Sequence, residues 1–483
     1  MKSFIPKRNH LCLSRDLFRR VNAASFPESR IRYQNLAWAE RLGLVGCAQD
    51  DAEWCRRFAR FESFPGSFRK PLALAYHGHQ FGVYNPEIGD GRGFLYAQME
   101  DPIDGRLLDF GTKGSGLTPF SRTADGRLTL KGAVREILAT ELLDALGVNT
   151  SKTFSVIETG EELQRHDEPS PTRSAVLVRL SHGHIRIGSF QRLAYNADSN
   201  RLIMLLRYAA KTYYPGVFPD TMSDEDLAEA FVGHLGGVLA DLAASWMAAG
   251  FVHGVLNTDN FNISGESFDY GPWRFLPRME PGFTAAYFDH QGRYAFGRQP
   301  EATFWALCRL ADCFVEITGM EAMQKAVNRF QEKINTSMIS ALCRRLGVDE
   351  AWDDAEAMCE TFFQTLKSMD IRYEDVFFDW YGGAASRNRA LDGPRAGTYR
   401  DPAFEKLRSF LASAPVRVGA NPEHAYFRRT DPVTMLIDEV EAIWAPVAAR
   451  DDWTGLEARI ADIHQMSQAY GFARVKPKSR IVS

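Results

Sequence analysis

The spacing of apolar residues changes part-way along this chain, and that change limits the folds open to it. Between residues 76 and 113, glycines separate short apolar runs such as 93–99 and 107–112, a pattern typical of strands joined by tight turns. From residue 201 the apolar spacing becomes helical over most of the remaining chain. A strand-rich first half and a helix-rich second half predict an α+β fold with two lobes and a cleft between them.

Several elements follow from this spacing. In 130–146 the apolar residues share one face, and Gly147 stands just beyond the last turn, where a left-handed cap would lie. Further helices are predicted over 202–213, 224–249, 304–318, 321–346 and 353–368. Two apolar runs, 174–180 and 185–190, flank a basic turn that contains histidine, and both are predicted to be strands.

Changes in composition divide the chain into units. Residues 1–70 are predicted to form an N-terminal extension packed on a larger body, 71–200 the strand-rich lobe and 201–391 the helical lobe. Glycines and prolines in and beside 392–401 mark that stretch as a linker. The remaining residues, 402–483, are predicted to form a smaller helical appendage.

The charge balance argues against partners that require a strong positive field. The 483 residues include 57 Lys and Arg against 61 Asp and Glu, a net charge of −4, so neither nucleic acid nor a membrane surface is an expected partner.

The seven cysteines are scattered and never spaced C-x-x-C, which is typical of reduced thiols. The first residues lack an apolar stretch long enough for a secretory signal, and charged residues interrupt 227–255, which favours a buried helix. We therefore expect a cytoplasmic protein.

The turn Gly89-Asp90-Gly91-Arg92-Gly93 is the first segment suited to chemistry. Its glycines would let backbone N–H groups approach a phosphate without obstruction by a Cβ atom. The alternative is an ordinary hairpin turn, in which alternating glycine and aspartate are common.

A lysine and a glutamate stand where a nucleotide-binding lobe would need them. Lys113 ends an apolar run, and Glu136 lies in the middle of the next predicted helix. Kinase-like folds use a strand lysine held by a helix glutamate to aim an ammonium group at nucleotide phosphates. The alternative is a surface pair with almost no effect on stability. Glycines at 114 and 116 favour the functional interpretation, because a solvated face gains nothing from them.

The strongest signal lies between His253 and Gly271. The chain reads HGVLNTDN from His253 to Asn260 and DYG from Asp269 to Gly271, close to the catalytic loop and D-x-G of kinase-like phosphotransferases. Val255 stands where the catalytic Asp of a kinase belongs. Because its isopropyl group cannot accept a proton, ordinary γ-phosphoryl transfer should be impaired.

Oxygen ligands for a divalent cation nevertheless remain. Asp259, Asn260 and Asp269 suit Mg²⁺ or Mn²⁺, so a metal-bound nucleotide is still expected. The alternative for 257–260 is an Asx turn, which its composition also permits. The nearby D-x-G favours the metal site.

Basic residues gather around these segments, and guanidinium groups suit bidentate contact with phosphate oxygens. They are Arg92, Arg122, Arg127, Arg179 and Arg186. Any one of them is more often a surface charge. Arg179 and Arg186 are the better candidates, since Ser181, His182 and His184 lie between them.

Taken together, these motifs resemble the selenoprotein O family. The resemblance rests on YHGHQFG at 76–82, GDGR at 89–92, KGSG at 113–116 with TPFSR at 118–122, DGR at 125–127, and the two blocks from His253 to Asn260 and Asp269 to Pro272. It runs from about Arg30 to Ala311 and fades in the C-terminal part.

Members of that family are similar in fold to protein kinases but transfer AMP from ATP, bound in a flipped orientation, to hydroxyl side chains of proteins. The resemblance implies that Asp259 accepts the proton and that Asn260 and Asp269 bind Mg²⁺ or Mn²⁺. It implies that the nucleotide is held by Gly89, Gly91, Arg92, Lys113, Asp125, Gly126, Arg179, Arg186 and Asp269, with Glu136 paired to Lys113. The expected partners are proteins with Ser, Thr or Tyr hydroxyls, including the protein itself.

The chain also departs from the family pattern. Gln191 stands where members often have an acidic residue, and Ala306 where they have asparagine. No cysteine lies near Ser483, so redox control through the tail is not expected. Two other activities stay open: a conventional kinase in which another base replaces Val255, and a non-catalytic nucleotide-binding scaffold.

Overall fold

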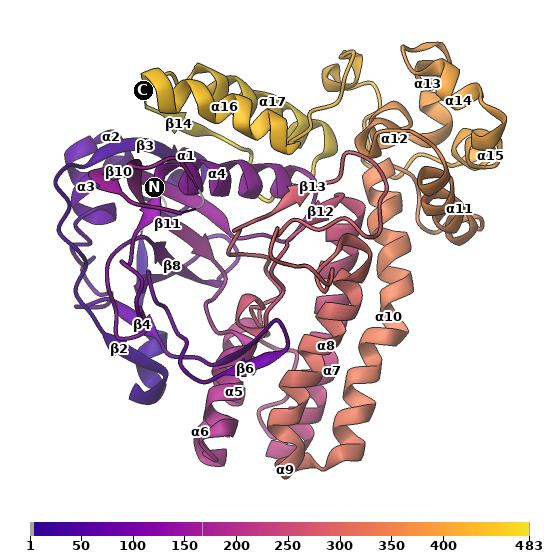
Figure 1. Ribbon diagram of the computed structural model, residues 1–483. Coiled ribbons are helices and arrows are strands. Elements are labelled where there is room, and N and C mark those ends of the chain that lie inside the picture. The colour runs from indigo at the N-terminus through magenta and orange to yellow at the C-terminus, as the bar shows by residue number, and fades with distance from the viewer. Residues whose placement is uncertain (1–3, 167, 483) are drawn as a thin grey trace.

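A strand-rich part and a helical part lie side by side in the computed structural model, which describes residues 4–166 and 168–482 (Figure 1). The predicted α+β class is confirmed. The strands come mainly from the first 181 residues, and the helices from the residues that follow.

An antiparallel sheet of ten strands forms the strand-rich part. Its main order is β14 (Ser479–Ile481), β3 (Arg30–Asn35), β10 (Lys152–Leu163), β11 (Thr172–Ser181), β8 (Leu107–Lys113), β7 (Leu95–Glu100), β4 (Leu72–Leu74) and β2 (Phe18–Arg20). Two further strands join it, β1 (Ile5–Lys7) on β7 and β9 (Leu128–Thr129) on β11. Separate two-stranded pairs are β5 (Gly78–Gln80) with β6 (Val83–Asn85), and β12 (Phe251–Val252) with β13 (Arg274–Phe275).

Both faces of the sheet are buried because its central strands are apolar on both sides. In β11, Ala175 and Leu177 pack in the core that contains helix α4 (Leu130–Ala145). The residues between and beyond them, Val176 and Val178, pack in the core formed with the N-terminal helices. Those helices are α1 (Leu36–Arg41), α2 (Val45–Gln49) and α3 (Asp51–Phe58). The predicted N-terminal extension thus packs on the sheet and also contributes β1, β2 and β3 to it.

Helix α4 begins where the sequence predicted and ends one residue earlier. The Thr129 side chain caps it by accepting a hydrogen bond from the Gly132 N–H, and the helix ends at Ala145. Gly147 follows with φ +82°, the left-handed conformation expected beyond a helix end.

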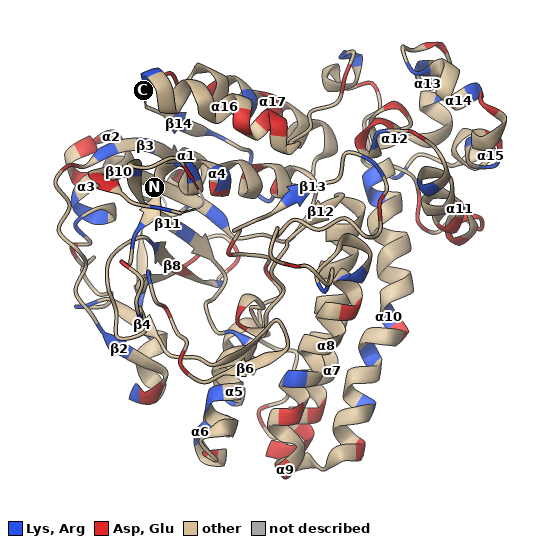
Figure 2. Cartoon of the chain, viewed as in Figure 1, with Lys and Arg blue, Asp and Glu red and all other residues tan. Residues whose placement is uncertain are grey.

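The helical part is built around three long helices. They are α7 (Asp224–Ala248), α8 (Gln299–Ala311) and α10 (Met320–Leu346), which pack together (Figure 1). The other helices are α5 (Ile187–Tyr195), α6 (Ser199–Tyr213), α9 (Val315–Thr318), α11 (Ala355–Ser368), α12 (Tyr373–Asp379), α13 (Arg387–Asp392), α14 (Ala396–Arg400), α15 (Glu405–Ser413), α16 (Ile437–Arg450) and α17 (Thr454–Tyr470). Figure 2 shows Lys and Arg interspersed with Asp and Glu along α10 and the outer helices, in agreement with the small net charge.

Helix α7 has a strongly apolar composition. Of the helices described, it is the one long and apolar enough to cross a membrane, but 61% of its apolar window is buried inside the protein. Its buried side chains pack against α8 and α10, as expected of a core helix.

Two predictions of local structure are wrong. Residues 185–190, expected to be a strand, contain the start of α5, because Ile187, Phe190 and Leu193 are buried at helical spacing. The expected linker 392–401 contains α14, in which the fully buried Tyr399 donates a hydrogen bond to Asp379 Oδ2 at 2.6 Å. The buried Tyr399 side chain thus anchors this segment to the rest of the protein, although the segment contains two glycines and a proline.

The C-terminal residues return to the strand-rich part. Helix α17 and helix α16 pack on α4, and β14 pairs with β3 at the edge of the sheet (Figure 1). Arg32 of β3 binds both Glu158 of β10 and Asp451, which follows α16. The segment predicted as a smaller helical appendage therefore also supplies a strand to the main sheet.

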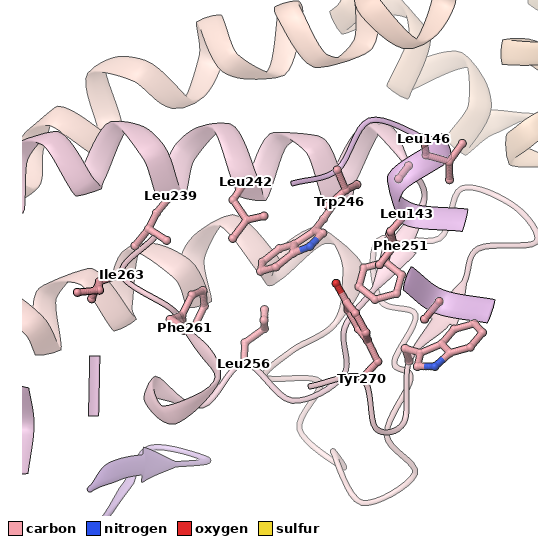
Figure 3. Close-up of a cluster of buried hydrophobic side chains, with 14 of the residues drawn as sticks. Leu143, Leu146, Leu239, Leu242, Trp246, Phe251, Leu256, Phe261, Ile263 and Tyr270 are labelled. Carbon is pink, nitrogen blue, oxygen red and sulfur yellow. The ribbon is translucent and has the colours of Figure 1, made fainter. Parts of the chain in front are cut away.

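A buried apolar cluster fixes the loop that runs from 251 to 270. Leu256, Phe261, Ile263 and Tyr270 of this loop point toward Trp246 and other side chains of α7 (Figure 3). Each of the four loop residues is at most 2% exposed. The turn Thr258–Asn260, which lies between Leu256 and Phe261 in the sequence, is thereby held in place.

Candidate functional site

A polar cleft of about 330 Å³ lies between the sheet and the loop that follows α7. Nine of the residues singled out in the sequence line it: Gly89, Gly91, Arg92, Lys113, Arg122, Arg179, Arg186, Asp259 and Asp269. The register of β8 and β11 explains part of this convergence, because Arg179 pairs with Gly111. Residues paired across neighbouring strands share a face of the sheet, and so do residues two apart along one strand. Lys113 is two residues beyond Gly111 on β8, so Arg179 and Lys113 project to the same side of the sheet.

Lys113 is the centre of a buried ion cluster. Its Nζ atom lies 2.7 Å from Glu136 Oε2 on α4 and 3.1 Å from Asp269 Oδ1. Arg179 Nη2 approaches the same Asp269 oxygen at 3.4 Å, and its Nη1 is buried without a hydrogen-bond partner among the described residues. This strand lysine, held by the glutamate of the next helix, has the arrangement that protein kinases use at nucleotide phosphates.

Asp269 remains ionised in this cluster. Burial alone would raise the pKa of its carboxyl group, but Lys113 and Arg179 outweigh burial and hold the pKa well below its usual value. The residue has φ +63°, an unusual conformation for a residue other than glycine.

The Nε2 atom of the fully buried His253 lies 2.9 Å from the carbonyl oxygen of Phe268. His253 therefore positions the D-x-G segment rather than facing the cleft.

Arg186 forms the wall of the cleft between the two parts. Its guanidinium group lies between the rings of Tyr76 and Phe268, at 4.3 and 4.9 Å from their centroids. It donates hydrogen bonds to Asp90 Oδ1 and to the carbonyl oxygen of Asp259, both at 3.1 Å. Its Nε is buried and unpartnered among the described residues. A planar anion in the cleft would meet an arginine whose orientation is already fixed.

Asp259 is a buried carboxylate that also lines the cleft. It lies on the 3-10 turn Thr258–Asn260 and is 9% exposed, and its Oδ1 has no hydrogen-bond partner among the residues described. Burial raises the pKa of this carboxyl group from 3.8 to about 6, with Arg186 opposing the rise and Asp269 adding to it. A carboxyl group that lines a cleft and has a pKa near neutrality is suited to accept a proton.

The turn that holds Asp259 is tied to the hairpin of β5 and β6. The His79 N–H donates to Thr258 Oγ1 at 2.7 Å, and Thr258 in turn donates to Gln191 Oε1 at 2.6 Å. Gln191, the position that departs from the family pattern, also contacts His79 through its amide nitrogen. Glutamine thus serves here as a neutral bridge, which a carboxylate could not replace without losing that amide donor.

The glycines of the turn before β7 are required by packing. A Cβ at position 89 would lie 2.5 Å from the Phe120 ring, and one at position 93 would lie 2.1 Å from the Thr112 carbonyl oxygen. Gly91 is also close, at 3.0 Å from the Phe120 carbonyl oxygen. These contacts account for the glycines whether or not the turn also meets a phosphate.

Three residues from the same part of the sequence do not line the cleft. Asp125 is exposed and pairs with Arg165 at 2.7 Å, and Arg127 pairs with Glu161. Gly126 has φ +71°, and a Cβ there would lie 2.4 Å from the backbone of Gly116. Their part in nucleotide binding stays a prediction.

Several lining residues were not predicted. They are Tyr76, Gln80, Asp90, Phe120 and His184. Four of them, Tyr76, Gln80, Asp90 and Phe120, stand inside motifs that the sequence analysis singled out, so position within a motif was the available signal. Their role depends on contacts between distant segments, which spacing along the chain does not reveal.

The residues predicted to bind a divalent cation are Asn260 and Asp269. No group of three or more His, Cys, Asp or Glu residues arranged to hold a metal ion occurs in 4–166 or 168–482. Asn260 donates its amide to the Val255 carbonyl at 2.9 Å, which orients its own oxygen. Asp269 lines the cleft, whereas Asn260 is not among its lining residues, so their shared role as Mg²⁺ ligands stays a prediction.

Comparison with known proteins identifies the family. The family model for protein adenylyltransferase SelO matches residues 6–464. The protein nucleotidyltransferase YdiU of Synechocystis sp. is 41% identical over 458 residues, covering 91% of this chain and 94% of the relative. That of Gloeobacter violaceus is 42% identical over 465 residues, covering 91% of each.

Among solved structures, ROP2 from Toxoplasma gondii, a virulence factor with a protein-kinase fold and no enzymatic activity, matches 71% of this chain and 83% of its own. The identity is 12% and the TM-score 0.25, too low to support a further conclusion. The family assignment rests instead on the family model and on relatives near 40% identity across nine-tenths of the chain. The chain belongs to the SelO family of protein adenylyltransferases.

Proposed function

We propose that the cleft binds ATP and transfers its AMP group to Ser, Thr or Tyr hydroxyls of protein substrates. The observation that carries this proposal is the buried carboxylate of Asp259, one oxygen of which has no hydrogen-bond partner among the described residues, in the same cleft as Lys113, Arg179 and Arg186. Family membership supports the same reaction. Val255, at the position of a kinase's catalytic Asp, argues against ordinary phosphoryl transfer.

In this proposal the cations neutralise the triphosphate. Lys113 is held in place by Glu136, and Arg179 and Arg186 are held by carboxylates and aromatic rings, so they need little reorganisation when a polyanion enters. Arg92 and the glycines at 89 and 91 border the same cleft. Asp125 and Gly126 would shape the neighbouring loop rather than contact the phosphates directly.

The transfer step is a displacement at the α-phosphorus. The acceptor hydroxyl oxygen forms the new bond to that phosphorus, the bond to the bridging oxygen of the β-phosphate breaks, and pyrophosphate leaves with the electron pair. Asp259, whose carboxyl group lines the cleft, takes the hydroxyl proton. The nucleotide would lie reversed relative to a kinase, with the α-phosphorus nearest Asp259.

A divalent cation, Mg²⁺ or Mn²⁺, would be held by Asn260 and Asp269. Bound there, it would supply positive charge to the phosphate oxygens. The low pKa of Asp269 keeps that carboxylate ionised and ready to act as a ligand.

Labelled nucleotides test the reaction directly. With Mg²⁺ or Mn²⁺ present, label from the α-phosphate of ATP is expected on protein, in step with release of pyrophosphate. Intact-mass analysis should show additions of AMP, including on the protein itself. Label from the γ-phosphate on the acceptor would establish a kinase instead. Thermal stabilisation by ATP with no label on any acceptor would establish a non-catalytic scaffold.

Arg92 should act in nucleotide binding alone. It is exposed, it lines the cleft, and no carboxylate of the described chain lies within salt-bridge distance of it. Arg92→Ala is therefore expected to raise the KM for ATP about 10-fold, the loss of one charge-assisted contact, with no change in Tm. A change in kcat with an unaltered KM would contradict this assignment.

The cellular setting is part of the proposal. All seven cysteines are free thiols in the structure, which supports a reducing, cytoplasmic compartment. We place the nucleotide between a strand-rich lobe, 71–200, and a helical lobe, 201–391. The hydroxyl-bearing protein substrates would approach from the open side of this cleft.

A further inference from the structure

We propose that an apolar patch beside the cleft recognises the acceptor protein as an extended segment, by an apolar residue about three positions from the modified hydroxyl. The patch consists of Phe81, Val83, Tyr287 and Phe288, and we call it the acceptor patch. This inference rests on the proposed function, because it assigns the substrate side of the same site.

The acceptor patch is exposed although it is apolar. Val83 is 71% exposed, Tyr287 79% and Phe288 41%. The rings form a continuous row, with centroids 5.7 Å apart between Phe81 and Phe288 and 5.1 Å apart between Phe288 and Tyr287. A contiguous group of exposed large apolar side chains, unlike a single one, is typical of an interaction site.

The patch is connected to Asp259 by one short hairpin. A Cβ on Gly78 would lie 2.9 Å from Asp259 Oδ1, so β5 begins beside the proposed base. Gln80 lines the nucleotide cleft and pairs across the hairpin with Val83. Residues two apart and cross-strand partners share a face of a hairpin, which places Gly78, Gln80 and Val83 on the same side.

The turn of this hairpin contains an aromatic residue in a backbone conformation that is unfavourable for such a residue. Phe81 and Gly82 form the two-residue loop, with φ +50° and +85°. Such a turn favours Asn-Gly, and a bulky residue at positive φ is strained. The Phe81 N–H donates to Asn257 Oδ1 at 3.0 Å, two residues before Asp259, which fixes the backbone of the turn. The Phe81 ring packs against Tyr294, with centroids 5.0 Å apart, and against Phe288. The strained aromatic residue indicates that its side chain has a use there.

These positions set the length of the acceptor segment. From Gly78 to Phe81 the hairpin advances three residues, about 10 Å at roughly 3.3 Å per residue. An extended substrate segment covers that distance in about three residues. An apolar side chain at that position would therefore reach the acceptor patch while the hydroxyl meets Asp259.

A peptide library tests the proposal. Peptides with a central Ser, Thr or Tyr, each randomised singly at five positions on either side, are incubated with the full-length protein, metal and α-labelled ATP. We expect labelling efficiency, kcat/KM, about 10-fold higher for apolar than for polar residues at three or four positions from the hydroxyl, on one side. The double variant Tyr287→Ser/Phe288→Ser should lose this preference and keep the wild-type KM for ATP.

Two further variants separate recognition from folding. Phe81→Asn places the residue that the turn favours, so the hairpin should form while the preference weakens. Val418→Ser removes an apolar side chain that is 93% exposed far along the chain, and it should leave the preference unchanged. The Tm of each variant, together with its KM for ATP, shows that the fold is retained.

Three outcomes would overturn the acceptor patch. They are labelling without any positional apolar preference, a preference that survives Tyr287→Ser/Phe288→Ser, and labelling of the protein itself but of no peptide. Sedimentation that shows a dimer dissociated by the same double variant would assign the patch to a second copy instead. A complete absence of α-label, including on the protein itself, would refute the proposed function and so be distinguishable from these.

Discussion

Replacing Asp259 with asparagine is expected to lower AMP transfer by about 10²- to 10⁴-fold, the usual effect of removing a general base, while making the protein more stable at neutral pH. The loss follows because an amide oxygen cannot accept the hydroxyl proton. The gain follows from burial, which raises the pKa of this carboxyl group from 3.8 to about 6. At pH 7 its ionisation therefore costs the folded protein about 3 kcal/mol, and asparagine removes that cost.

The two effects have different pH dependences. Below about pH 4 the carboxyl group is protonated in both the folded and the unfolded protein, so wild type and Asp259→Asn should have similar free energies of unfolding. As pH rises from 4 through about 6, the unfolded carboxyl group loses its proton first, and wild type loses stability relative to the variant. Between pH 4 and 8, kcat/KM of the wild type should rise with a midpoint near pH 6 and then level off, since only the ionised form accepts a proton.

Thermal unfolding from pH 4 to 8 and initial rates with α-labelled ATP measure both effects. Asp353→Asn, which changes an exposed aspartate in the turn before α11, is the matched control and should alter neither quantity. An Asp259→Asn protein that kept wild-type activity would remove Asp259 from the proposed chemistry. A variant that was inactive but destabilised at pH 7 would show that the carboxylate is mainly structural.

The parts of the fold that the sequence predicted well are long and strongly periodic. The boundaries of α4, α7 and α10 lie within one residue of the expected ones, because each helix has many buried positions at helical spacing and a clear cap or glycine at an end. Residues 185–190 are too few to distinguish a helix from a strand by spacing, and the start of α5 was mistaken for a strand. In 392–401 two glycines and a proline indicated a linker, and the importance of the one buried residue, Tyr399, could not be recognised from the sequence.

The candidate site shows a similar division. Lys113, Arg179, Asp259 and Asp269 belong to motifs whose residue types reflect chemistry, and they line one cleft. The contacts that orient them come from residues with other, more common explanations. Phe268 is an ordinary apolar residue in the sequence, and only the fold brings its ring beneath the Arg179 and Arg186 guanidinium groups.

Breaking the Lys113–Glu136 pair from one side should cost both stability and activity. Lys113→Met leaves Glu136, which is 0% exposed, without its partner at 2.7 Å. Removing one member of a buried pair typically costs 3–5 kcal/mol, and we expect about 3 kcal/mol here, because Arg179 Nε lies 3.9 Å from the other Glu136 oxygen and offsets part of the charge. AMP transfer should fall by about 10²-fold or more, since a preorganised cation is lost.

The double variant Lys113→Met/Glu136→Gln separates the two losses. With both charges removed, no unpaired charge is buried, and most of the lost stability should return. Activity should not return, because the ammonium group that faces the phosphates is still missing.

Lys325 and Glu229 provide the matched control, since they form a pair of the same residue types at the same 2.7 Å but on the surface. Lys325→Met should cost less than about 1 kcal/mol and leave AMP transfer unchanged. If the double variant recovered activity along with stability, Lys113 would act only by holding α4 against the sheet, and nucleotide binding would have to rest on the arginines alone.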